Sequence, residues 1–136
     1  MYRAKQGGRN ALHFFAPEMQ AAIDQRLQLQ SELRQAVQRN QLYLVFQPQL
    51  ALSTELVTGA EVLLRWVHPE RGEIMPGDFI PLAEETGLIE ELGTWVLEQA
   101  CAALARWLPS WPQMVLAVNL SPRELRQASC VARIRD

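Results

Sequence analysis

The chain has 136 residues, which is enough for one ordinary domain but not obviously for two. Its hydrophobic share of 49% and charged share of 21% are typical of a globular protein. The net charge of −2 argues against a nucleic-acid polymer as partner, and the lack of an apolar run near the ~20 residues of a membrane helix argues against a membrane segment.

The first predicted element is a helix over residues 17–39, preceded by a short basic segment that breaks at Gly7-Gly8. Apolar side chains recur in this helix mostly at spacings of three and four, among many Gln, Glu and Arg residues. They are Ile23, Leu27, Leu33 and Val37. The apolar stripe is too short and irregular to predict a coiled coil.

Residues 42–47 are predicted to form a strand whose continuation Pro48 limits, because proline cannot donate to a sheet. Gln47 is a polar group at the end of this apolar strand. From its chemistry alone we expect the Gln47 side chain to lie in water.

A second strand, residues 57–67, carries two charges among apolar residues. Side chains alternate along a strand, so Glu61, Leu63 and Arg65 share one face. Burying both charges without partners is costly. The pair is therefore either a structural ion pair or a strand end in water, or else it lines a site where the carboxylate faces a cation and the arginine an anion.

The next segment, His68-Pro69-Glu70-Arg71-Gly72, has turn composition, and we expect His68 to be a turn residue and not a ligand. A short helix then begins at Pro76-Gly77, with Asp78 as its N-cap and Pro81 in its first turn. Gly87 is predicted to end this helix.

Glu84 and Glu85 resemble a metal-binding pair, but neighbours on a helix do not face each other, so we expect at least one in solvent. Residues 88–108 form the strongest predicted helix. Its apolar stripe includes Cys101, which we expect to be a buried thiol. Cys101 and Cys130 lack metal or redox spacing, which favours a reducing, cytoplasmic setting.

Residues 114–120 read as a parallel strand buried on both faces, with Asn119 as its one polar side chain. Ser121-Pro122-Arg123-Glu124 then predicts a helix start with a capping box. The alternation of strands and helices indicates parallel βαβ architecture. In barrels built from βαβ units, polar residues at the C-terminal ends of strands form the active site. Glu61 and Asn119 fit such positions, and together they supply two oxygens suited to Mg²⁺ or Mn²⁺.

The run Glu61-Val62-Leu63-Leu64-Arg65-Trp66, followed by His68-Pro69, resembles the signature strand of the EAL domain family, the cyclic-di-GMP phosphodiesterases. Three further blocks match the family in the same order, namely Phe46-Gln47-Pro48, residues 72–89 and Val118-Asn119-Leu120-Ser121. The first residues resemble the end of a GGDEF domain, the diguanylate cyclase module that often precedes EAL domains. The resemblance divides the chain into a GGDEF remnant (1–16), a linker helix (17–31) and the N-terminal part of an EAL domain (32–136).

This resemblance implies an α/β fold, an incomplete (β/α)8 TIM-like barrel of which only the first strands and helices are present. It also implies metal-dependent hydrolysis of cyclic-di-GMP to linear pGpG in bacterial second-messenger signalling. By this resemblance, Glu61 and Asn119 match metal ligands, and Arg65 matches an arginine that contacts a phosphate. Leu63 matches a residue that packs near a guanine, and Gln47 matches a glutamine that helps to hold the dinucleotide. Val62 stands where the family has Ala, but its side chain points away from the expected site.

The family's later acidic ligands lie beyond Asp136, so we expect this chain to be inactive alone. An open half-barrel or the linker helix is expected to drive self-association. The setting implied is cytoplasmic, either as a separate protein or as the cytoplasmic part of a larger, sensor-linked one. The alternative is a non-catalytic module for cyclic-di-GMP binding or assembly, although the retained Glu61, Arg65 and Asn119 favour descent from a catalytic domain.

Overall fold

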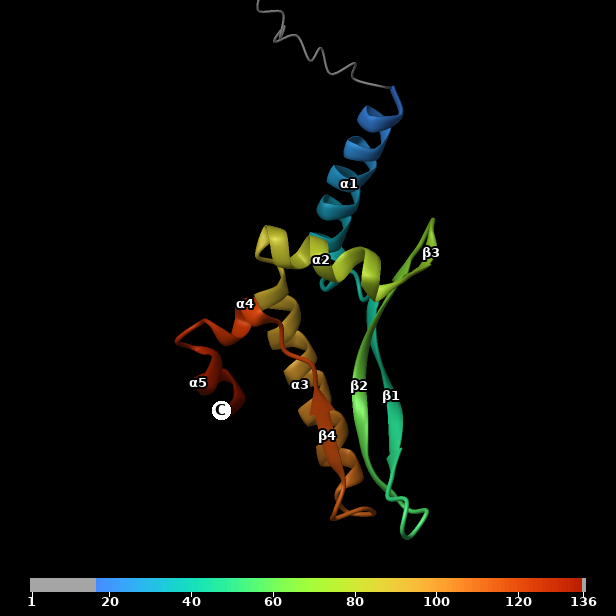
Figure 1. The fold of residues 1–136 in the computed structure, drawn as a ribbon, viewed down its shortest axis with the longest axis vertical. Coiled ribbons are helices and arrows are strands. Elements are labelled where there is room, and N and C mark those ends of the chain that lie inside the picture. Colours follow the sequence, from blue (N-terminus) through green and yellow to red (C-terminus); the bar gives the residue numbers. More distant parts are fainter. Residues whose placement is uncertain (1–16, 136) are drawn as a thin grey trace, which may run out of the picture.

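The computed structural model describes residues 17–135 (Figure 1). The expected GGDEF remnant, residues 1–16, lies outside the described residues. The helices and strands of the described part, in chain order, are α1 (Pro17–Ala36), β1 (Leu42–Leu50), β2 (Val57–His68), β3 (Gly72–Ile74), α2 (Pro76–Thr86), α3 (Ile89–Trp107), β4 (Val115–Val118), α4 (Pro122–Leu125) and α5 (Cys130–Arg135).

Strand β2 is the centre of a mixed sheet. It pairs antiparallel with β1 and β3 and parallel with β4. The parallel pairing runs from Gly59 opposite Val115 to Val62 opposite Val118, and α2 and α3 lie between these two strands in the chain. The predicted βαβ connection is therefore confirmed.

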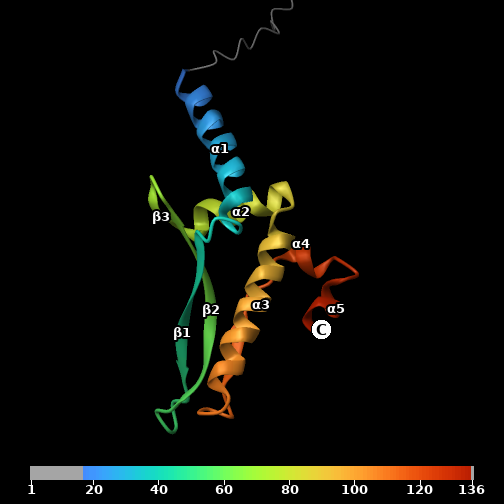
Figure 2. The same cartoon turned by 180° about the vertical axis from the view of Figure 1, so that it is seen from behind.

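The core lies between the sheet and the helices that pack on one of its faces. Figures 1 and 2 show α3 running alongside the sheet and α1 extending away from it at one end. Trp66 and Val62 of β2 are buried, at 0% and 3% exposure, whereas Glu61 and Arg65 are half-buried on the other face. The predicted alternation of β2 is thus confirmed.

Two predictions about prolines are wrong. Strand β1 does not stop at Gln47 but continues through Pro48, which lies opposite Ala60, to Leu50. In the described sheet β1 is an edge strand, and an edge strand tolerates proline because alternate N–H groups point away from its neighbour. Pro81 lies inside α2 and not in its first turn, on an exposed side of the helix.

The expected N-cap of α2 is also wrong. Met75 is the N-cap and makes no side-chain hydrogen bond, while Asp78 lies in the first turn. Pro76 takes the first helical position, where its fixed φ suits the helix, so the helix begins earlier than expected. The predicted end is confirmed, since Gly87 has a left-handed φ of 81°.

The Cys101 thiol is exposed and not buried, because the adjacent Ala100 and the following Ala103 form the sheet-facing side of α3. Strand β4 is also less buried than expected: Val115 is 62% exposed. Among the described elements, helix α3 packs on one side of β4, so burial alternates along it. The helix after Ser121 is short as well, ending at Leu125.

No helix within residues 17–135 is both long and apolar enough to cross a membrane.

Candidate functional site

The structure brings together the two residues expected to bind metal. The Asn119 side-chain amide donates a hydrogen bond of 2.7 Å to Glu61 Oε1, although the two are 58 residues apart in the chain. Glu61 lies in the middle of β2 and not at its C-terminal end. It nevertheless lies where β4 ends, because Ala117 is its partner on β4 and Asn119 follows directly after that strand.

The register of β1 places the remaining expected site residues on the same face as Glu61. Gln47 is the cross-strand partner of Glu61, and residues directly opposite each other project to the same side of a sheet. Leu63 and Arg65 follow Glu61 on this face at every second position. We call the five residues Gln47, Glu61, Leu63, Arg65 and Asn119 the polar face of the sheet.

Arg65 is held by a partner that the sequence did not reveal. Its Nε lies 3.5 Å from Oε1 of Glu73 on β3, and its Nη1 donates a hydrogen bond of 2.9 Å to the carbonyl oxygen of Leu64. The structural ion pair considered from the sequence therefore exists, but it joins Arg65 to Glu73 and not to Glu61. Glu73 is the cross-strand partner of Val67, which is the next residue after Arg65 on the same face of β2.

A cavity of about 310 Å³ lies between β2, the segment after β4, α2 and α3, and of the polar face it is lined by Leu63, Arg65 and Asn119 but not by Gln47 or Glu61. Arg65, Glu84 and Asn119 provide polar groups in its lining, and its apolar wall includes Val96. A mostly apolar hollow with a few convergent polar groups is the usual form of a small-molecule site. Glu84 was not foreseen here. Its neighbour Glu85 is exposed and pairs with Arg26, which confirms that at least one of the two glutamates faces solvent.

The oxygens of Glu61 and Asn119 fit part of a site for a hard divalent cation. Carboxylate and amide oxygens are the ligands that Mg²⁺ and Mn²⁺ prefer. The Asn119 nitrogen now faces Glu61, and a rotation of the terminal amide exchanges its oxygen and nitrogen. Within the described range 17–135 no group of three or more His, Cys, Asp and Glu side chains is placed to hold a metal. The pair therefore supplies two ligands and not a complete cage.

His68 was expected in the turn but is the last residue of β2, and its side chain holds the turn that follows. Its Nδ1 accepts the backbone N–H groups of Glu70 and Arg71 at 3.2 Å each, which closes the turn between β2 and β3. The other ring nitrogen of His68, Nε2, lies 3.4 Å from Oε2 of Glu32 on α1. This buried contact between α1 and the end of β2 could not be read from local sequence.

Comparison with known proteins identifies close similarities. The family model for the EAL domain matches residues 30–136. The bifunctional diguanylate cyclase/cyclic di-GMP phosphodiesterase MucR of Pseudomonas aeruginosa is 44% identical over 137 residues, covering 100% of this chain and 20% of MucR. The cyclic di-GMP phosphodiesterase PdeR of Escherichia coli is 42% identical over 136 residues, again covering 100% of this chain and 20% of the relative. The chain thus spans about a fifth of the length of these relatives.

A solved structure of the PaMucR phosphodiesterase in a c-di-GMP complex superposes with a TM-score of 0.77 at 45% sequence identity. The superposition covers 79% of this chain and 44% of that one. This chain therefore has the mixed α/β fold of part of such a domain.

Proposed function

Because the chain belongs to the EAL domain family and is related to cyclic-di-GMP phosphodiesterases, we propose that it forms part of such an enzyme. The observation that supports this most directly is the Asn119–Glu61 contact of 2.7 Å. It joins the family's signature strand to the end of the next parallel strand, where barrels of this architecture place their catalytic groups.

We propose that the fold is the first part of a (β/α)8 barrel. The parallel pairing of β2 with β4 and the α3 layer on one face of these strands support this proposal. The division into residues 1–16, 17–31 and 32–136 is likewise a proposal. Helix α1 runs without a break across the boundary after residue 31.

Each residue of the polar face has a role in this proposal. Glu61 and Asn119 would hold Mg²⁺ or Mn²⁺, which when bound polarises a phosphate and lowers the pKa of the attacking water. Arg65 would bind phosphate oxygens through its guanidinium. Leu63 would pack against a guanine, and the Gln47 amide, exposed beside Glu61, would hydrogen-bond to the dinucleotide.

We infer that this chain alone does not hydrolyse cyclic-di-GMP, since Glu61 and Asn119 are two ligands of a site that needs more. A binding or assembly module is the second candidate. Apolar side chains exposed along α1 support it, because such a stripe favours self-association. They are Met19, Ile23 and Leu27.

A chimera tests the proposal. The segment of the MucR phosphodiesterase that matches this chain is replaced by the chain, and cyclic-di-GMP turnover is measured with Mn²⁺ or Mg²⁺. We expect pGpG to form, and Glu61→Ala to lower turnover by at least about 100-fold, because even groups behind metal ligands cost 10- to 100-fold. Glu98→Ala, an exposed glutamate of α3, is the control and should leave turnover unchanged.

The same variants are then compared in the isolated chain by calorimetry with cyclic-di-GMP. A folded chimera that binds the nucleotide without cleaving it would contradict the enzyme proposal and support the binding module. Hydrolysis by the isolated chain that disappears in Glu61→Ala would instead show that association of copies completes the site.

A further inference from the structure

Glu124 is a carboxylate buried at the start of α4, with 2% of its side chain exposed. Its Oε2 accepts the backbone N–H of Ser121 at 3.0 Å, and the Ser121 hydroxyl accepts the N–H of Glu124 at 3.2 Å. This reciprocal pair confirms the predicted capping box. A capping box usually sits at a solvent-exposed helix end, and the burial of this one requires a further explanation, because burying a carboxylate is costly.

The carboxylate fits a gap in the surface of α3. Gly93 lies within that helix, and a Cβ added there would overlap with Oε1 and the carboxylate carbon of Glu124. A glycine in a helix interior has a conformational cost, so the absence of a side chain at this position has a packing role. The start of α4 is therefore seated directly against the backbone of α3.

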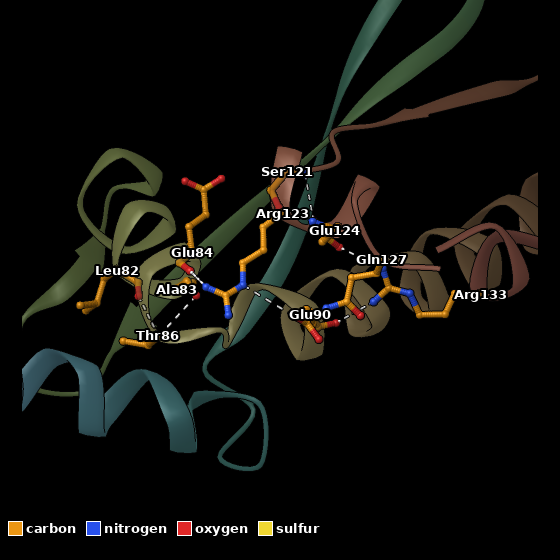
Figure 3. Close-up of polar contacts among 10 residues, drawn as sticks. All are labelled: Leu82, Ala83, Glu84, Thr86, Glu90, Ser121, Arg123, Glu124, Gln127 and Arg133. Carbon is orange, nitrogen blue, oxygen red and sulfur yellow. Dashed lines mark hydrogen bonds and ion pairs between the residues drawn. The ribbon is translucent and has the colours of Figure 1, made fainter. Parts of the chain in front are cut away.

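Arginines from α4 and α5 tie this part of the chain to α2 and α3, as Figure 3 shows, and Arg133 is the one that faces the Glu124 carboxylate. Arg133 Nη2 lies 3.6 Å from Glu124 Oε1, an oxygen without a hydrogen bond in the described part of the chain. Arg133 Nη1 also donates to the carbonyl oxygen of Glu90 and to the hydroxyl of Thr94, both at 3.1 Å. On the other side, Arg123 donates to the carbonyl oxygen of Glu84 at 2.8 Å.

This cluster lies immediately after the proposed ligand. Ser121, whose N–H Glu124 binds, is two residues beyond Asn119, and only Leu120 separates them. We propose that Glu124 is a positioning residue: seated at Gly93 and faced by Arg133, it fixes the turn between β4 and α4 so that the Asn119 amide reaches Glu61. The consequence for cation binding rests on the proposed function, whereas the effect on the Asn119 amide does not.

The amide signal of Asn119 measures this positioning. The chain has three asparagines, Asn10, Asn40 and Asn119, so isotope labelling of asparagine gives a simple side-chain amide spectrum of the whole chain. The signal that is lost in Asn119→Ala is the signal of Asn119. The spectrum of Glu61→Ala then shows where this signal lies when the hydrogen bond to Glu61 is absent. We expect Glu124→Ala and Gly93→Ala each to move the signal to that unbonded position.

Matched variants separate positioning from general loss of stability. Glu124→Gln keeps an acceptor for the Ser121 N–H. Its Asn119 signal should therefore keep at least half of the difference between the wild-type position and the unbonded position. Glu91→Ala removes an exposed charge from α3, Gly77→Ala adds a Cβ where nothing lies within 4 Å, and Ile74→Val trims a buried residue on β3. All three should leave the Asn119 signal in place, even where Ile74→Val lowers the melting temperature.

An Asn119 signal that stays in its wild-type position in folded Gly93→Ala and Glu124→Ala would overturn the proposal. If Glu124→Ala does not fold, Gly93→Ala decides, because it displaces the carboxylate without removing it. Manganese titration of the chimera carrying the same substitutions then tests the proposed function. We expect binding to weaken about 10- to 100-fold in Glu124→Ala. A displaced amide in the isolated chain, together with manganese binding to the chimera that is unchanged in Glu61→Ala, would keep the positioning role and contradict the metal site.

Discussion

The guanidinium of Arg65 lies beside the carboxylate of Glu73 on the neighbouring strand β3, with 3.5 Å between Nε and Oε1. Glu61, on the same strand and face as Arg65, is instead bonded to Asn119. The two charges that the sequence placed together are thus held by separate partners. If Arg65 binds a phosphate, Glu73 competes with that phosphate for the guanidinium.

The first prediction concerns this competition. Glu73→Gln removes the competing charge, so we expect the chimera described above to bind cyclic-di-GMP up to about fivefold more tightly, since a partly exposed ion pair contributes at most about 1 kcal/mol. Calorimetric titration measures the change. Glu70→Gln, on the exposed turn beside β3, is the control. Unchanged binding in Glu73→Gln would rule out the competition, and weaker binding would show that the carboxylate orients Arg65 for the ligand.

The bond between Glu61 and Asn119 should appear as a coupling free energy. A double-mutant cycle with Glu61→Ala and Asn119→Ala, measured by urea unfolding, is expected to give about 0.5–1.5 kcal/mol, the range for a single hydrogen bond. Additive effects of the two substitutions, within about 0.3 kcal/mol, would mean that the contact adds nothing to stability.

His68 should be required for the turn between β2 and β3. His68→Ala leaves the N–H groups of Glu70 and Arg71 without their acceptor and removes one of the two groups beside the Glu32 carboxylate, so we expect a loss of about 1–3 kcal/mol in the free energy of unfolding. His68→Asn keeps a side-chain acceptor near the turn and should recover part of this loss. Equal losses in both variants would assign the effect to packing instead.

Trp66 is the largest fully buried side chain of the described residues, with its ring against Phe79 and its indole N–H bonded to Gln41. Trp66→Ala is expected to lower the free energy of unfolding by about 3–5 kcal/mol, which is a large part of the stability of a small domain. Trp111→Ala is the matched control, because that ring is 57% exposed and should cost about 0.5 kcal/mol or less. Thermal unfolding followed by circular dichroism checks both.

Local patterns in the sequence were sufficient for the alternation of β2, the extent of α3 and the capping box of Ser121 and Glu124, because each depends on residues close together in the chain. The errors at Pro48, Cys101 and Val115 depend on which edge or side of an element has a neighbour, and periodicity does not contain that information. The partners of Arg65 and His68 were missed for the related reason that Glu73 and Glu32 belong to other elements. Family resemblance placed Glu61 and Asn119 in one site, and it offered no signal for the burial of Glu124.

The separation of 58 residues between Glu61 and Asn119 has a kinetic consequence. Strands β1 and β2 are joined by a short loop and can pair early, whereas β4 can reach β2 only after the intervening chain has closed a long loop. We therefore expect the contact between the two side chains to form late in folding. A ligand that bridges them would bind only the fully assembled chain, and a folding intermediate with an intact β1–β2 hairpin would not recognise it.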